Sequence, residues 1–406
     1  ADALYNVNKN IIGPDSGFAG RLYTNAILYP KATSQMAKTI LSPFTHMRNF
    51  LSAGAFATAN GLIPFIGPGE GAARKALRAL QLGPRTKEGN EIYRELLERG
   101  VVNSQVQLAD LKALLKDIDF GSTLGSIKAF NKLAKGLSRV KRFAQDAYTA
   151  EDDFWKIFSY YKEQDRLFAA YEKAGIAQGN NFVNMAGNTV KFNRETVAQE
   201  AAAIVRNNIP NYAYVSDFVK GLRQYPLGNF VSFPAEIMRT GTNIVKRGLD
   251  EVFYSVKVGK DTVNPLRTIG LTRLLGMGVT TSAVPYAAVS AGQALYDISR
   301  DELEAIRRYV PKWSKNSTLI PMKGEDGKFK YIDFSHMNAY DTLTRPIQTV
   351  INRVQAGEQD KDGIMDDFIL GLFESTKELG APFITESIWT EALADLYIRG
   401  GETRDG

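Results

Sequence analysis

Two long stretches of this chain contain no charged residue, and they constrain its fold more than any other feature. The first uncharged stretch has 21 residues between Arg48 and Glu70, and the second has 23 residues between Arg273 and Asp297. As a helix, each is about long enough to cross a bilayer. Two interpretations stay open: buried helices of a soluble helical protein, or segments that enter or line a membrane in another state.

Small side chains recur at every fourth position in both stretches. In helical form the residues of each stretch share one face: Ala53, Ala57 and Gly61 in the first, and Ala283, Ala287 and Ala291 in the second. Small residues at this spacing let helix backbones approach closely. We therefore predict that these six residues are sites of close helix packing or membrane contact.

Neither stretch is rich in leucine, isoleucine or valine, so spontaneous insertion into a bilayer is marginal. Each also contains a proline. Because a proline inside a helix removes one hydrogen bond and clashes with the preceding turn, we expect Pro285 to kink or interrupt the second helix.

Composition excludes several kinds of chemistry. The 406 residues include no cysteine, which rules out disulfides, thiolate catalysis and cysteine-containing zinc sites. The two histidines, His46 and His336, lie far apart and lack partners at metal-ligand spacing. The acidic run from Glu358 to Asp367 lacks the spacing of a calcium-binding loop, and we interpret it as a solvated helix N-terminus. We predict no catalytic residue, metal or cofactor.

Charge is distributed unevenly along the chain. Residues 1–142 hold 20 lysines and arginines against 10 acidic residues, whereas residues 358–406 hold 4 against 12. The segment SIKAFNKLAKGLSRVKRFA predicts a cationic amphipathic helix, whose charged face carries Lys128, Lys132, Lys135, Arg139 and Arg142. This face is suited to non-specific contact with DNA phosphates or anionic lipid. Opposite charges at the two ends also favour packing between copies of the chain.

The periodicity predicts a mainly α protein, an elongated assembly of many helices with one small β-hairpin near 317–334 that turns at Asp326-Gly327. Aromatic residues between 154 and 171 are spaced as core residues of a helix. Residues 176–192 read as a polar loop. One helix is expected to begin at Ser42-Pro43, and the region 122–173 is expected to form one helix or two that are broken near Gly136. Further helices are expected near 71–82, 88–99, 106–118, 194–208, 213–224, 230–256, 299–309, 338–356, 363–379 and 385–398.

Three regions are predicted: a basic N-terminal helical region (1–175), a central helical region with the second uncharged stretch (176–310), and a hairpin followed by acidic helices (311–406).

Three segments resemble parts of the large internal core, or ejection, proteins of short-tailed, marine-type tailed phages and the related giant polyvalent virion proteins. They are KATSQMAKTILSPFTHMRNFLSAGAFATANG (31–61), RDELEAIRRYVPKWSKNSTLIPM (300–322) and FKYIDFSHMNAYDTLTRPI (329–347). The resemblance implies a protein stored inside the capsid with the portal and other core proteins. On infection it would form a homo-oligomeric channel that carries DNA across the host envelope.

Some members of that group carry a peptidoglycan-cleaving transglycosylase or a polymerase, but this chain lacks the matching motifs. The expected function is therefore non-enzymatic. Two alternatives stay open: a portion of a virion-associated peptidoglycan hydrolase, and a plain helical scaffold or connector.

Overall fold

The computed structural model describes residues 52–63, 69–82, 87–102, 153–211, 232–310, 318–324, 326–334 and 360–374. It also describes eight single positions between 338 and 354: 338, 340, 343, 344, 347, 350, 353 and 354. Several sequence predictions fall outside these residues. They include both histidines, the helices near 106–118, 213–224 and 385–398, and the five basic residues of the cationic helix.

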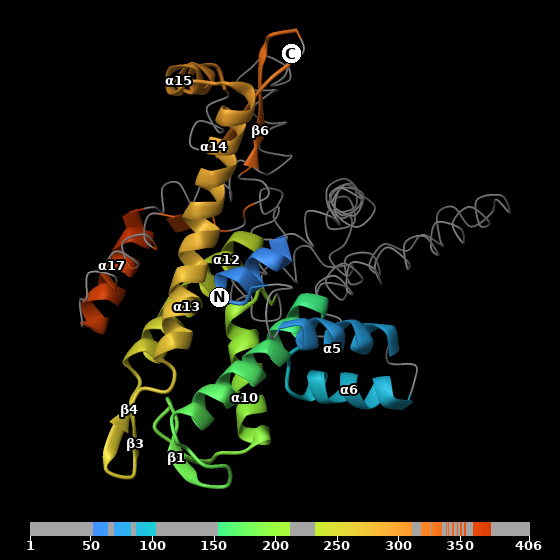
Figure 1. Cartoon of the computed structure of the whole chain (residues 1–406), viewed down its shortest axis with the longest axis vertical. Helices are drawn as coiled ribbons and strands as arrows, with labels where there is room; N and C mark the ends of the chain where they lie inside the picture. The colour runs from blue at the N-terminus through green and yellow to red at the C-terminus, as the bar shows by residue number, and fades with distance from the viewer. Residues whose placement is uncertain are drawn as a thin grey trace, which may run out of the picture.

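The described part of the chain is mainly helical, as the sequence predicts (Figure 1). Two helices whose described parts span 52–59 and 153–173 pack with α10 (Arg194–Asn208), α12 (Ser232–Phe253) and α13 (Arg267–Gly278). Helices α5 (Gly69–Leu82) and α6 (Lys87–Glu98) form an antiparallel pair at one side, and α17 (Lys361–Glu374) contacts α12. Helix α13 continues into η3 (Val279–Ala283) and α14 (Val284–Tyr296), and together they run along the longest axis of the molecule.

Local signals set the helix ends close to where the sequence predicts them. Helix α10 begins after Asn193, whose side-chain oxygen accepts a hydrogen bond from the Thr196 amide at 2.8 Å. Helix α15 (Arg300–Tyr309) begins with a capping box between Ser299 and Glu302. The helix containing 153–173 is followed by Gly175, whose φ of 83° is accessible to glycine at little cost.

The strands form three small antiparallel pairs within the described residues, whereas the sequence analysis expects one. The expected hairpin is present as β5 (Leu319–Lys323) and β6 (Phe329–Asp333), with Gly327 at positive φ in its turn. The other two pairs are β1 (Asn181–Val183) with β2 (Thr189–Lys191), and β3 (Val256–Val258) with β4 (Asp261–Val263).

The expectation of a plain polar loop over 176–192 is wrong, as is a helix reaching 256. Strands of three residues are too short to show an alternating pattern in a sequence. Tertiary contacts hold the β1–β2 pair in place, because Phe182 in β1 and Phe192, directly after β2, are buried against Tyr171. Four of the six aromatic residues predicted to be core are buried: Phe154, Trp155, Phe158 and Tyr171. The other two, Tyr161 and Phe168, are partly buried and pack against the core.

The buried apolar residues form one main core and one small separate cluster. The main core takes residues from all three regions that the sequence analysis distinguishes, from Phe56 to Phe368. The small cluster contains Ile306, Val310 and Leu319. We call the elements around the main core the body. We call α14, α15 and the β5–β6 hairpin the arm, which projects from the body in Figure 1.

Candidate functional site

The most distinctive element is the helix formed by α13, η3 and α14, which runs without a break from Arg267 to Tyr296. Its 30 residues are long and apolar enough to cross a membrane by length and composition. A core helix of a soluble protein can meet the same criterion, so its burial is informative. Only 39% of its most apolar 18-residue window is buried.

Pro285 does not break this helix. The turn before it widens into the π-turn η3, in which the Val284 amide donates to the Val279 carbonyl. The expected kink is therefore a local change of hydrogen-bond pattern, which keeps the two halves of the helix continuous.

Much of the second uncharged stretch faces solvent. Ala283, Ala287 and Ala291, which share a face in the sequence analysis, are all exposed. Larger apolar residues are exposed with them, namely Leu275, Val279, Val284, Tyr286 and Leu295. Close packing of the three alanines against another helix stays a prediction.

The first uncharged stretch is different, because its described part belongs to the main core. Ala57 is fully buried and Ala53 packs against the core. Gly61 has a φ of 72°, and a Cβ atom there would lie 2.5 Å from the Thr272 carbonyl oxygen. A Cβ on Gly276 would lie 2.3 Å from the Thr58 carbonyl oxygen. The two glycines therefore bring the end of helix 52–59 into backbone contact with α13.

Beside this contact, Arg273 lies fully buried at the centre of an ion-pair network. Its guanidinium donates to both oxygens of Glu251 at 2.9 Å, from Nε and Nη2. Nη1 donates to Glu163 Oε1 at 3.0 Å and to Asn60 Oδ1 at 2.8 Å. A planar fork held by two carboxylates and an amide has all its donor directions used.

The network continues to either side of Arg273. Arg166 binds Glu163, with Nε 2.7 Å from Oε2, and donates to the Asn60 carbonyl at 3.2 Å. Arg247 Nε donates to Glu251 Oε1 at 2.7 Å, and Arg247 Nη2 donates to Glu200 Oε1 at 2.6 Å. We call this set the arginine network: three arginines alternate with three glutamates, and it joins four helices, namely 153–173, α10, α12 and α13.

The surroundings favour the charged forms of the buried glutamates. Burial opposes ionisation of Glu251, but the neighbouring Arg273 and Arg247 outweigh it and lower its pKa to about 2. Burial likewise opposes ionisation of Glu163, and Arg166 and Arg273 lower its pKa below the ordinary value. At the Glu200 end of the arginine network, the Tyr171 hydroxyl donates to Glu200 Oε2 at 3.0 Å. Burial, and after it the charge of Glu200, raise the pKa of Tyr171.

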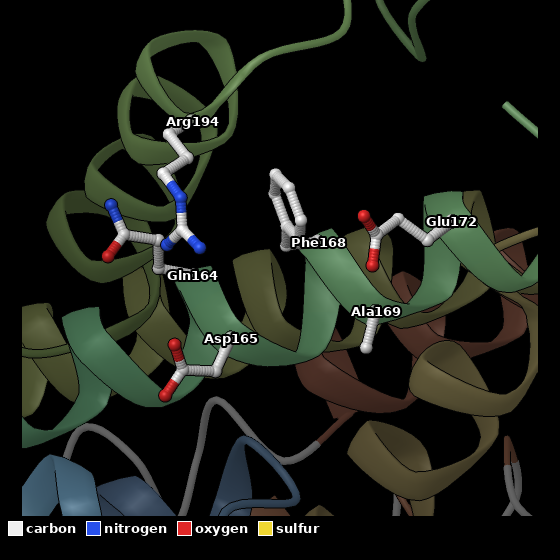
Figure 2. Close-up of a pocket in the computed structure, with 6 residues that line it drawn as sticks. All are labelled: Gln164, Asp165, Phe168, Ala169, Glu172 and Arg194. Atoms are coloured by element: carbon white, nitrogen blue, oxygen red, sulfur yellow. The ribbon is translucent and has the colours of Figure 1, made fainter. Parts of the chain in front are cut away.

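Two small surface hollows lie among the described residues. One of about 130 Å³ lies on helix 153–173, where Figure 2 shows the Arg194 guanidinium beside the Phe168 ring. The guanidinium carbon is 5.0 Å from the ring centroid. A second hollow of about 280 Å³ lies between α10 and α12. Ligand sites usually enclose about 300–1,000 Å³, so we place the candidate site on the exposed helix surface.

Sequence reasoning missed the arginine network. From the sequence, Arg273 is only the boundary of the second uncharged stretch, and Asn60 is not singled out. A signal is nevertheless present, because Glu163 lies within the stripe of aromatic residues between 154 and 171. A carboxylate on a buried helix face requires a buried partner. The partner itself lies 110 residues away in the chain.

No protein-family model, no curated protein and no solved structure matches this chain.

Proposed function

We propose that this chain is a non-enzymatic structural protein of a phage virion, part of the internal core, that is released during infection to help form a channel for genome ejection. The resemblance of segments 31–61, 300–322 and 329–347 supports the virion assignment. The structural observation that carries the proposal is the apolar helix from Arg267 to Tyr296, which is anchored at one end and exposed along the other.

Anchor and exposed surface have separate roles in this proposal. The arginine network and the glycine contact hold α13 in the body. Beyond Met277 no residue of the helix belongs to the main core, within the part of the chain that the structure describes. The exposed face there combines alanines with larger apolar residues such as Tyr286 and Leu295, so it can remain in water and still enter the boundary of a bilayer.

The same proposal includes other copies of the chain, other virion proteins and DNA as partners. Small residues on the exposed face suit close packing between helices of neighbouring copies in a membrane. The basic N-terminal third suits contact with DNA during ejection, through sequence-independent attraction to phosphates.

The plain scaffold is favoured by one observation, which concerns the first uncharged stretch. Phe56, Ala57, Ala59 and Leu62 are buried, so in this conformation that stretch is part of the core.

The alternative hydrolase requires a carboxyl group able to give a proton to a sugar. Glu163, Glu200 and Glu251 are instead each paired with arginine.

Vesicle binding tests the proposal. The protein is mixed with vesicles of phosphatidylglycerol and phosphatidylethanolamine, and both flotation and dye leakage are measured. Ala287→Glu places a charge on the exposed face without disturbing the core. Since a charge at the centre of a bilayer costs about 3 kcal/mol, we expect binding to weaken by up to about 100-fold.

Leu77→Glu is the matched control, because Leu77 is exposed on α5 and the change adds the same charge away from the helix. Equal losses in the two variants would show that net charge alone governs the interaction. An unchanged protein that neither binds nor permeabilises the vesicles would reject the membrane role and leave the scaffold.

A further inference from the structure

The junction between body and arm carries hydrogen bonds that an uninterrupted α-helix would not need. In η3 the Val284 amide donates to a carbonyl five residues back. Pro285 has no amide hydrogen, so it can donate neither to the Thr281 carbonyl, as in an α-helix, nor to the Thr280 carbonyl, as in a π-helix. The Thr280 and Thr281 carbonyls are thus the two positions at which the missing amide leaves room for a donor from elsewhere.

Two side chains supply those donors. Asn338 Nδ2 donates to the Thr280 carbonyl at 3.1 Å, and Thr344 Oγ1 donates to the Thr281 carbonyl at 2.9 Å. Asn338 is itself buried, and its Oδ1 accepts from the Tyr340 amide at 3.1 Å. A buried polar group is costly to leave without a partner, so these bonds hold the π-turn in its place.

The donors are fixed to the body. Tyr340 and Leu343 are fully buried in the main core, and the Tyr340 ring meets Phe56 edge-on at 5.4 Å between centroids. A Cβ on Gly241 of α12 would lie 2.4 Å from Leu343 Cδ1, which shows how closely this segment is packed.

The arm, by contrast, is built to keep its shape by itself. Its cluster of Ile306, Val310 and Leu319 is separate from the main core. Gly292 lets the hairpin lie against α14, because a Cβ there would be 2.7 Å from the Pro321 carbonyl oxygen. Hence α14, α15 and the hairpin can move as one unit.

We propose that η3 is a hinge between body and arm, and that the hydrogen bonds from Asn338 and Thr344 lock it. The hinge is inferred from these contacts alone. That its opening turns the already exposed face of α14 toward a membrane rests on the proposed function. With the lock broken, the arm changes its direction relative to the body while each keeps its own core.

Distance measurements between spin labels test the hinge in solution, without lipid. The chain has no cysteine, so Lys246→Cys on α12 and Tyr309→Cys on α15 give two unique labelling positions. Both positions are exposed. In the labelled protein we expect one narrow distance distribution. Adding Asn338→Ala and Thr344→Val should broaden the distribution and shift its mean.

Hydrogen exchange gives a second readout. Amides of α14 should exchange about tenfold faster or more in the lock variant, and those of α10 and α12 should keep their protection. Thr344→Val alone preserves side-chain shape and should give a smaller change of the same kind, so the test survives if the double variant fails to fold.

Thr242→Val is the matched control, because the Thr242 hydroxyl donates within α12, to the Met238 carbonyl at 2.8 Å. It should leave the distribution unchanged. An equally narrow distribution with an unmoved mean in both lock variants would overturn the hinge. Since no vesicle is present, that result would leave the membrane experiment to be judged separately.

Discussion

At the scale of single residues, two glycines decide how closely helix 52–59 and α13 approach. Gly61 adopts a positive φ that other residues rarely adopt, and Gly276 leaves room for the Thr58 carbonyl. The sequence analysis names Gly61 from its spacing, yet the glycine that faces helix 52–59 lies in α13. Spacing puts Gly61 on the face of Ala53 and Ala57, but the helix ends before Gly61, and spacing does not identify the partner of a face.

Gly276→Ala should destabilise the protein. Its Cβ would lie 2.3 Å from the Thr58 carbonyl oxygen, so one backbone must shift, at a cost of about 1–3 kcal/mol. Urea unfolding followed by circular dichroism measures the loss. In Gly71→Ala, on α5, the new Cβ meets nothing within 4 Å, and the change should stabilise by about 0.5–1 kcal/mol. Equal effects at the two positions would contradict the close approach.

At the scale of elements, the arginine network decides how four helices are joined. A buried ion pair adds little stability relative to apolar residues of the same shape, because desolvation offsets the attraction. Its members are nevertheless interdependent, since removing Arg273 leaves the buried carboxylates of Glu163 and Glu251 with fewer partners. We infer that the network fixes the position of α13 against helix 153–173 and α12, more than it adds to total stability.

Arg273→Met should cost about 3–5 kcal/mol, because Glu163 and Glu251 stay buried with fewer partners. The free energy of unfolding in urea tests this. Arg267→Met is the control on the same helix: Arg267 is exposed, and the change should stay within about 0.5 kcal/mol. If both variants unfold at the same urea concentration, the network does not hold α13.

At the scale of the whole molecule, body and arm depend on different interactions. The body combines the main core with the buried charges, whereas the arm has one small apolar cluster and a hairpin against α14. Acid, which protonates carboxylates, should therefore destabilise the body before the arm.

Acid should weaken the body through the network. The pKa of Glu251 falls from its ordinary 4.5 to about 2 on folding, so the unfolded chain takes up the proton first. This stabilisation is complete above pH 4.5 and is lost as the pH falls toward 2. Unfolding free energies measured from about pH 7 down to about pH 2 should be level and then decline. A flat profile down to the lowest pH would contradict it.

Local sequence patterns encode the helical class, several helix ends and the β5–β6 hairpin. These depend on residues a few positions apart, such as the Ser299 and Glu302 capping box. The packing of the helices sets which uncharged stretch is buried and which is exposed. It also sets which charges pair. Arg273 meets Asn60 across 213 positions of the chain. No local pattern encodes such a contact, because it forms only when separate helices pack together.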